Sequence, residues 1–185
     1  MASRIHHPRL VFGLLLLFGV VVAASLSPLR IATGNSLPKG FYWLSPPSPS
    51  RGDIALACLP APAAKLGRAR GYLRAGECEG GVRPVGKSVA AVQGDFISLG
   101  QGEIRVNGVR IGTHSPPDLD SRGRPLSRVP DGTYEVGRGE VWLVSTHHPL
   151  SWDSRFFGPV SERDILGELL PIWVLAPAMS SEPAR

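Results

Sequence analysis

Glycine and proline place the tightest limit on what this chain can fold into. Its 185 residues include 22 glycines and 18 prolines, whereas ordinary proteins carry about 12% of the two together. Glycine costs backbone entropy in a helix, and proline removes a hydrogen-bond donor. Apolar residues still make up 43% of the chain, which is enough for a packed core. This composition predicts short strands joined by turns. It excludes an all-helical bundle, a collagen-like fibre and a multi-pass membrane protein.

Short runs of strand-forming residues recur along the chain and are separated by turn signals. Asn107-Gly108 is the strongest of these signals, because this dipeptide favours the tight turn of a two-residue hairpin. Three stretches rich in proline, glycine or polar residues, 27–40, 60–81 and 113–135, are expected to be loops. The expected strands are Phe41–Leu44, Asp53–Leu59, Lys87–Val92, Asp95–Leu99, Ile104–Val106, Val109–Ile111, Glu140–Ser145 and Gly167–Leu175.

One apolar run near the amino terminus approaches the thickness of a bilayer. It covers residues 10–26, and a helix of that length rises roughly 26 Å against a hydrocarbon core of about 30 Å. Arg4 and Arg9 precede it, which favours a cytoplasmic amino terminus and export of the rest. The small residues Ala23–Ser25 also fit a cleavable signal peptide. The run is longer than the roughly 7–15 residues of a signal core, so we favour an uncleaved anchor.

This run divides the chain into four expected parts. Residues 1–9 form a cytoplasmic amino terminus, 10–26 a single transmembrane helix, 27–175 one exported domain, and 176–185 a flexible tail. The expected fold class is therefore mainly β: an antiparallel sheet or coiled barrel with long loops, preceded by one transmembrane helix.

Charge and histidine spacing speak against a nucleic-acid partner and a metal. The net charge is +5, and no block of five or six like charges occurs. His114, His147 and His148 lack the helical spacing or the carboxylate cluster of a metal site. We therefore expect neither a nucleic acid nor a metal or other cofactor.

The two cysteines, Cys58 and Cys78, are expected to form a disulfide. In an exported chain an even pair more often forms a bridge than a metal site or a nucleophile. Such a bridge closes a loop of about 20 residues, worth roughly 3 kcal/mol in the chain-entropy model. Two buried thiols are the alternative.

Isolated polar residues in apolar surroundings are the remaining candidates for chemistry. Ser36 lies on a sharp turn between Gly34 and Pro38, where an ordinary turn serine is the simpler interpretation. Lys87 opens an apolar strand, where a lysine is usually an edge residue whose amine reaches solvent. If it is buried instead, the pKa of its amine falls and it becomes a usable general base.

Four segments, in order, resemble the signature of a protease family. They are Asn35–Tyr42, Lys87–Asp95, the Asn107-Gly108 turn and Ser151–Val160. Together they resemble the nucleophile box, the lysine box, the following turn and the Ser-x-Asp-Ser-Arg box of the signal peptidase I superfamily of Ser-Lys proteases. Within it, the chain is most similar to the TraF-like conjugative transfer signal peptidases.

The resemblance implies a role for each matching residue. Ser36 would attack the scissile carbonyl, and Lys87 would accept its proton. Ser151 would orient the Lys87 amine, whereas Asp153 and Arg155 would form a supporting ion pair. The Ser36 N–H would donate to the oxyanion.

Two positions depart from the family pattern. Ser88 stands where such enzymes carry arginine, and Gly34 stands where housekeeping leader peptidases offer a hydroxyl to the oxyanion. For the second of these, the substitute donor that we consider is either Thr33 or a backbone N–H.

The resemblance also implies a place and a substrate. The chain would be a monomeric serine endopeptidase of the bacterial inner membrane, with its catalytic domain in the periplasm. Its partners would be the lipid bilayer and an exported precursor, with a conjugative pilin as the expected client. The alternatives are a housekeeping type I signal peptidase and, from another class, a non-catalytic scaffold of a secretion apparatus.

Overall fold

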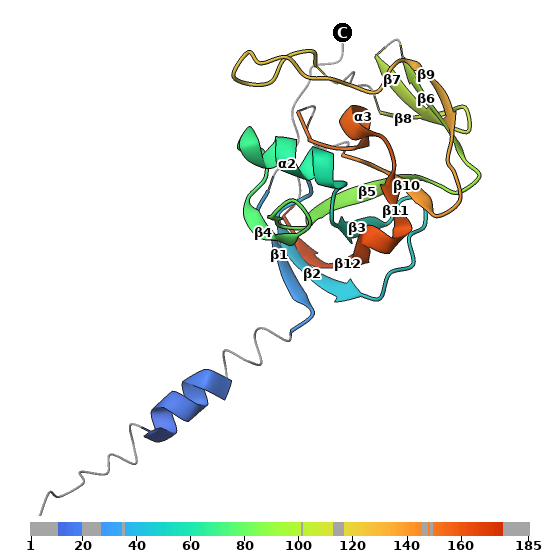
Figure 1. Ribbon diagram of the computed structural model, residues 1–185. Helices are drawn as coiled ribbons and strands as arrows, with labels where there is room; N and C mark the ends of the chain where they lie inside the picture. Colours follow the sequence, from blue (N-terminus) through green and yellow to red (C-terminus); the bar gives the residue numbers. More distant parts are fainter. Residues whose placement is uncertain are drawn as a thin grey trace, which may run out of the picture.

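Antiparallel pairing builds two sheets in this computed structural model (Figure 1). It describes residues 11–19, 27–34, 36–100, 102–112, 117–145, 148 and 150–175. The strands are β1 (Leu29–Ala32), β2 (Gly40–Ser45), β3 (Ile54–Ala57), β4 (Ala75–Cys78), β5 (Val85–Val92), β6 (Phe96–Gly100), β7 (Glu103–Val106), β8 (Val109–Gly112), β9 (Gly132–Glu135), β10 (Glu140–Val144), β11 (Val160–Ser161) and β12 (Ile165–Val174). Between the strands lie helix α2 (Ala61–Ala69), helix α3 (Ser154–Phe157) and the 3₁₀ helix η1 (Glu162–Asp164).

The larger sheet has the order β1-β2-β12-β3-β5-β10-β11, and the smaller has the order β8-β7-β6-β9. The prediction of a mainly β, antiparallel fold is confirmed. The predicted hairpin at Asn107-Gly108 joins β7 to β8, and Asn107 takes the positive φ of 50° that such a turn requires.

β5 is an inner strand of the larger sheet and lies between β3 and β10. Its residues Val85–Ser88 pair with β3, and Ser88–Val92 pair with β10. Side chains alternate between the faces of a strand, so Lys87, Val89 and Ala91 are buried in turn. A lysine is thus carried into the interior by the same alternation that buries its apolar neighbours.

Regular structure replaces part of each loop that the sequence predicted. Residues 27–40 contain β1, 60–81 contain α2 and β4, and 113–135 contain β9. α2 forms because proline is tolerated in the first helical turn, where its missing N–H would have no partner. Pro60 is the N-cap residue and Pro62 lies in that turn, and Ala63 and Ala64, of the residue type that forms helices best, follow. The prolines that suggested a loop mark the start of a helix.

The predicted anchor at 10–26 lies partly outside the described residues. Residues 11–19 are helical. Within the part of the chain that the structure describes, no helix has the length and apolar character to cross a membrane. The predicted tail at 176–185 lies outside the described residues altogether.

The predicted disulfide between Cys58 and Cys78 is present, with Cα atoms 5.6 Å apart. Cys58 directly follows β3, and Cys78 ends β4. The bridge therefore ties the end of β3 to the segment that leads into β5. Both half-cystines contact the main core cluster, which also contains Ala63 and Ala64 of α2.

Removing this bridge should destabilise the domain. The two cysteines are 20 residues apart in sequence, so replacing both with serine should lower the free energy of unfolding by about 3 kcal/mol. Thermal unfolding of the double variant, with and without reductant, measures this loss. An unchanged melting temperature, or a reductant effect that persists in the double variant, would contradict the prediction.

Candidate active site

Ser36 lies on the short connection between β1 and β2, and the residues that follow it hold this connection in place. Leu37 is buried in a small cluster with Tyr42 and Leu169. The Tyr42 hydroxyl donates to the Pro38 carbonyl at 2.8 Å. Ser36 itself is half-buried. Its loop is therefore anchored to β2 and β12 immediately after the serine.

Lys87 is buried, with only 3% of its surface exposed. Burial is the main cause that lowers the pKa of its amine to about 8. The nearby Asp153 carboxylate raises this pKa, and the Arg155 guanidinium lowers it. A lysine with this pKa is neutral in about a tenth of molecules at pH 7 and in about half of them at pH 8. The neutral amine has the lone pair that a general base requires.

The structure brings Ser36, Lys87 and Ser151 together from three separate segments. The Lys87 Nζ lies 2.7 Å from the Ser36 Oγ, and it also donates to the Ser151 Oγ. The two hydroxyl oxygens are 3.4 Å apart. A serine hydroxyl within hydrogen-bond reach of a buried amine, which a second group orients, is the arrangement of an activated nucleophile.

A buried ion pair lies next to this cluster. Asp153 and Arg155 are almost fully buried, and the Arg155 Nε and Nη2 donate to the two Asp153 carboxylate oxygens at 2.8 Å each. Asp153 also caps α3 by accepting from the Arg155 N–H. The Arg155 Nη2 reaches the Ser151 carbonyl at 3.4 Å. The pair thus fixes the backbone that carries Ser151.

Ser145 joins the cluster, although the sequence analysis did not single it out. It follows β10 and is buried. Its hydroxyl donates to the Ser36 carbonyl at 2.8 Å, and its N–H donates to the Asp153 Oδ2 at 3.1 Å. A serine at the end of an apolar strand carries no distinctive local signal, and its contact spans 109 positions, so only the fold reveals it.

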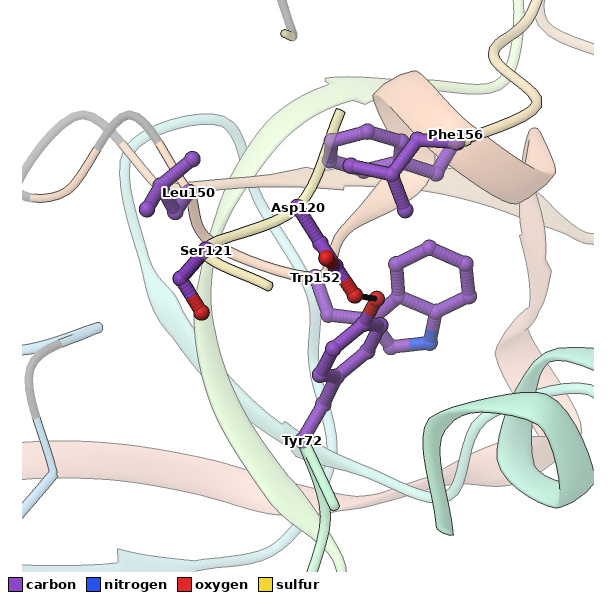
Figure 2. Close-up of a pocket in the computed structure, with 7 residues that line it drawn as sticks. Tyr72, Asp120, Ser121, Leu150, Trp152 and Phe156 are labelled. Carbon is purple, nitrogen blue, oxygen red and sulfur yellow. Dashed lines mark hydrogen bonds between the residues drawn. The ribbon is translucent and has the colours of Figure 1, made fainter. Parts of the chain in front are cut away.

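A small pocket of about 70 Å³ lies beside the segment that carries Ser151 (Figure 2). Trp152 stacks on Phe156 with ring centroids 5.1 Å apart, and its indole N–H donates to the Ala63 carbonyl of α2. The segment after Ser151 is thereby packed onto the core. The pocket is lined by Tyr72, Asp120, Ser121, Leu126, Leu150, Trp152 and Phe156.

Asp120 closes one wall of this pocket. Burial acts to raise the pKa of its carboxyl, but hydrogen bonds from Tyr72, from the Arg124 and Arg122 N–H groups and from the Arg124 side chain together lower it below its ordinary value. The Tyr72 hydroxyl donates to Asp120 directly, as Figure 2 shows. This contact fastens the loop around Asp120 to the chain that follows α2.

The other described residues that the sequence analysis named make no hydrogen bond to the side chains of Ser36, Lys87 and Ser151. Thr33 is exposed directly after β1, and its role as an oxyanion donor stays a prediction. Asn35, His114 and His147 lie outside the described residues. His148 accepts a hydrogen bond from the Leu150 N–H at its Nδ1. Among the described residues, no group of three histidine, cysteine or acidic side chains is placed to hold a metal.

With this geometry in view, the comparisons define the class of protein. The family model described as signal peptidase, peptidase S26, matches residues 4–174. The chain therefore belongs to the signal peptidase S26 family. A likeness to a signal peptidase I from Enterococcus faecalis covers 68% of this chain and 99% of that one. The two chains are 22% identical, with a TM-score of 0.40.

The individual relatives are conjugation proteins. The plasmid transfer protein TraF of Escherichia coli is 34% identical over 148 residues, covering 77% of this chain and 81% of that protein. The conjugal transfer protein TraF of Agrobacterium fabrum is 31% identical over 167 residues, covering 88% and 92%. The resemblance drawn from the four sequence segments is thus confirmed.

The lowered pKa of Lys87 can be measured directly, because the chain has only three lysines. Lys39 and Lys65 are exposed and serve as reference signals. With ¹³C at the lysine Cε, the Lys87 resonance should titrate with a midpoint near 8. The amine holds its proton below that pH and loses it above. A Lys87 midpoint of 10 or higher would contradict the buried environment.

The buried ion pair should matter far more to stability than an exposed one. Asp153→Ala removes the carboxylate from a buried pair, which typically costs about 3–5 kcal/mol. Asp131 makes a comparable contact with Arg128 at 2.7 Å, but both side chains are exposed, so Asp131→Ala should cost about 0.2–1 kcal/mol. Denaturant unfolding of the two variants gives the comparison. Equal losses would refute the structural role of the buried pair.

Proposed function

We propose that this chain is a membrane-anchored serine endopeptidase that removes leader sequences from exported precursors. The observation that carries the proposal is the buried Lys87 amine 2.7 Å from the Ser36 hydroxyl. A serine hydroxyl is a weak nucleophile unless a base takes its proton during attack. A lysine of lowered pKa supplies that base without a histidine.

The reaction follows from these positions. The Ser36 Oγ attacks the scissile carbonyl carbon while its proton passes to the Lys87 Nζ, and the Ser36 N–H donates to the developing oxyanion. The Lys87 ammonium then returns the proton to the leaving amine as the C–N bond breaks, which leaves an acyl-enzyme. Water then attacks the acyl carbonyl carbon while Lys87 takes its proton, and Lys87 passes that proton to the Ser36 Oγ as the ester C–O bond breaks, which releases the new carboxyl terminus. Ser151 keeps the amine directed at the Ser36 oxygen throughout.

The precursor would bind as an added strand along β5. The pairing of β10 with β5 begins at Ser88, so Val85–Lys87 extend beyond it, and on that side no strand among the described residues pairs with them. An open strand edge binds an extended peptide through backbone hydrogen bonds. This edge leads directly to Lys87, which would place the scissile bond beside the base.

A pilin precursor is the client that we propose, because relatives that share about a third of the sequence are named as transfer proteins of plasmids and of conjugation. In cells that carry the conjugation genes, the wild-type chain and Ser36→Ala are compared by mass spectrometry of exported amino termini. The processed pilin terminus should appear only with the wild type. Many processed precursors would favour a housekeeping peptidase, and no difference would favour a scaffold.

Both members of the proposed dyad should be indispensable. Ser36→Ala and Lys87→Ala should each lower precursor processing on the order of 10⁴-fold or more, without changing expression or membrane location. The matched controls are Ser98→Ala, which removes a hydroxyl whose hydrogen bond to Thr133 is exposed, and Lys65→Ala, which alters an exposed lysine. Processing that persists in either dyad variant would overturn the assignment.

The bilayer is proposed as a second partner, and an exposed apolar face supports it. Trp43 lies opposite Leu29 on one side and Leu170 on the other. Phe41 lies opposite Ile31 on one side and Trp173 on the other. The ring centroids of Phe41 and Trp173 are 6.0 Å apart. We call these side chains the apolar face; its members are Leu29, Ile31, Phe41, Trp43, Leu170 and Trp173, each 39–64% exposed.

The position of this face in the chain points to lipid as its occupant. β1, the first strand of the face, begins three residues after the apolar run at 10–26 ends. Tryptophan is favoured at the boundary between water and lipid, because its ring is apolar and its N–H is polar. An anchor that ends at the membrane surface would leave the face beside the headgroups.

Tryptophan fluorescence tests this contact in the intact chain. The four tryptophans divide evenly: Trp43 and Trp173 are exposed on the apolar face, whereas Trp142 and Trp152 are buried. Brominated lipids should quench about half of the emission in vesicles. Replacing Trp43 and Trp173 with phenylalanine should abolish the quenched part. Quenching that is absent in the wild type, or unchanged in the double variant, would exclude the contact.

A further inference from the structure

We propose that Ser145 is a positioning residue that clamps the nucleophile loop through the Ser36 carbonyl. This inference rests on the proposed function, in which Ser36 is the nucleophile. Ser145 is buried and lies 109 positions from Ser36, and its hydroxyl donates to the Ser36 carbonyl oxygen at 2.8 Å. Its role is distinct from that of Ser151, which contacts the two reacting side chains.

Such a clamp matters because the described residues before Ser36 show little packing. Apart from its chain neighbours, Gly34 has no heavy atom within 4 Å of the position where a Cβ would lie, and Thr33 is exposed. After the serine, Leu37 is buried, and Tyr42 holds the Pro38 carbonyl. The carbonyl of Ser36 lies between these two regions. A hydrogen bond to it fixes the peptide plane that follows Ser36, and with it the direction of the Ser36 side chain.

Ser145 is itself held by the buried ion pair. Its N–H donates to the Asp153 Oδ2 at 3.1 Å, and Asp153 is bound on both oxygens by Arg155. The contact therefore runs from a rigid ion pair, through the backbone and hydroxyl of Ser145, to the backbone of Ser36. The same ion pair reaches the Ser151 carbonyl. One buried anchor thus positions both serines that flank the Lys87 amine.

The clamp should act on the chemical step and leave precursor binding and the base unchanged. Misplacing a reacting group by about 1 Å can cost about 100-fold in rate. Ser145→Ala should therefore lower kcat about 10- to 100-fold, with KM within about twofold of wild type. The Lys87 NMR midpoint should stay near its wild-type value, because Ser145 makes no hydrogen bond to that amine in the described contacts.

The experiment uses the full chain in vesicles and a fluorogenic peptide that spans the pilin leader cleavage site. Ser145→Thr keeps the hydroxyl and should restore the rate to near wild type. If its extra methyl lowers the melting temperature more than Ser145→Ala does, Ser145→Cys, a weak donor of similar shape, should give an intermediate rate. Ser154→Ala is the matched control, because Ser154 is also buried and its hydroxyl accepts from the Leu143 N–H instead.

A second measurement tests the contact without any activity. The chain contains three Ser-Leu pairs, at 25–26, 36–37 and 98–99, so labelling serine carbonyls with ¹³C and leucine nitrogens with ¹⁵N yields three correlated signals. The Ser36-Leu37 signal should shift in Ser145→Ala and stay in place in Ser154→Ala.

The outcomes separate the clamp from the proposed function. A wild-type chain that cleaves no peptide in a Ser36-dependent manner overturns the proposed function, while the carbonyl signal still reports on the contact. An unmoved Ser36-Leu37 signal, a kcat within twofold of wild type, or an equal loss of kcat in Ser154→Ala would overturn the clamp. A Lys87 midpoint displaced by Ser145→Ala would overturn it as well.

Discussion

The burial of one amine governs the rest of this structure. A charged lysine is costly to place in an apolar interior, and the cost falls if the amine gives up its proton. β5 carries Lys87 inward by strand alternation, with β3 on one side and β10 on the other. The two hydroxyls at Ser36 and Ser151 then supply polar partners that a neutral amine can use. Chemistry and stability impose the same demand here, because both favour an uncharged Lys87.

The neighbouring ion pair leaves that balance largely undisturbed. Asp153 favours the charged form of Lys87 and Arg155 opposes it, so the two influences act in opposite directions and burial remains the leading cause. A single buried carboxylate at this place would favour the protonated amine, which could not act as the proposed base. Pairing Asp153 with Arg155 therefore lets the protein use a rigid polar anchor next to the site without recharging the lysine.

The sequence predicted the parts of this molecule that have local signals or family-like segments. Strand alternation located β2, β3 and β5, the Asn107-Gly108 turn located its hairpin, and the cysteine pair located the bridge. The approach of Ser36 to Lys87 followed from resemblance, since no local pattern brings residues 51 positions apart together. α2 was missed because its prolines suggested a loop, and Ser145 was missed because its one distinctive contact is tertiary.

The hairpin of β1 and β2 carries both the proposed nucleophile and most of the apolar face. Its connection carries Ser36, while its strands carry four of the six members of the apolar face. If that face rests on lipid, the depth of the hairpin in the bilayer sets the height of the Ser36 hydroxyl above the headgroups. Substrates would then be selected by how far their scissile bond emerges from the bilayer, in addition to the residues beside that bond. A shift of the hairpin by one strand residue would move that height by about 3.3 Å, roughly one position along an extended precursor.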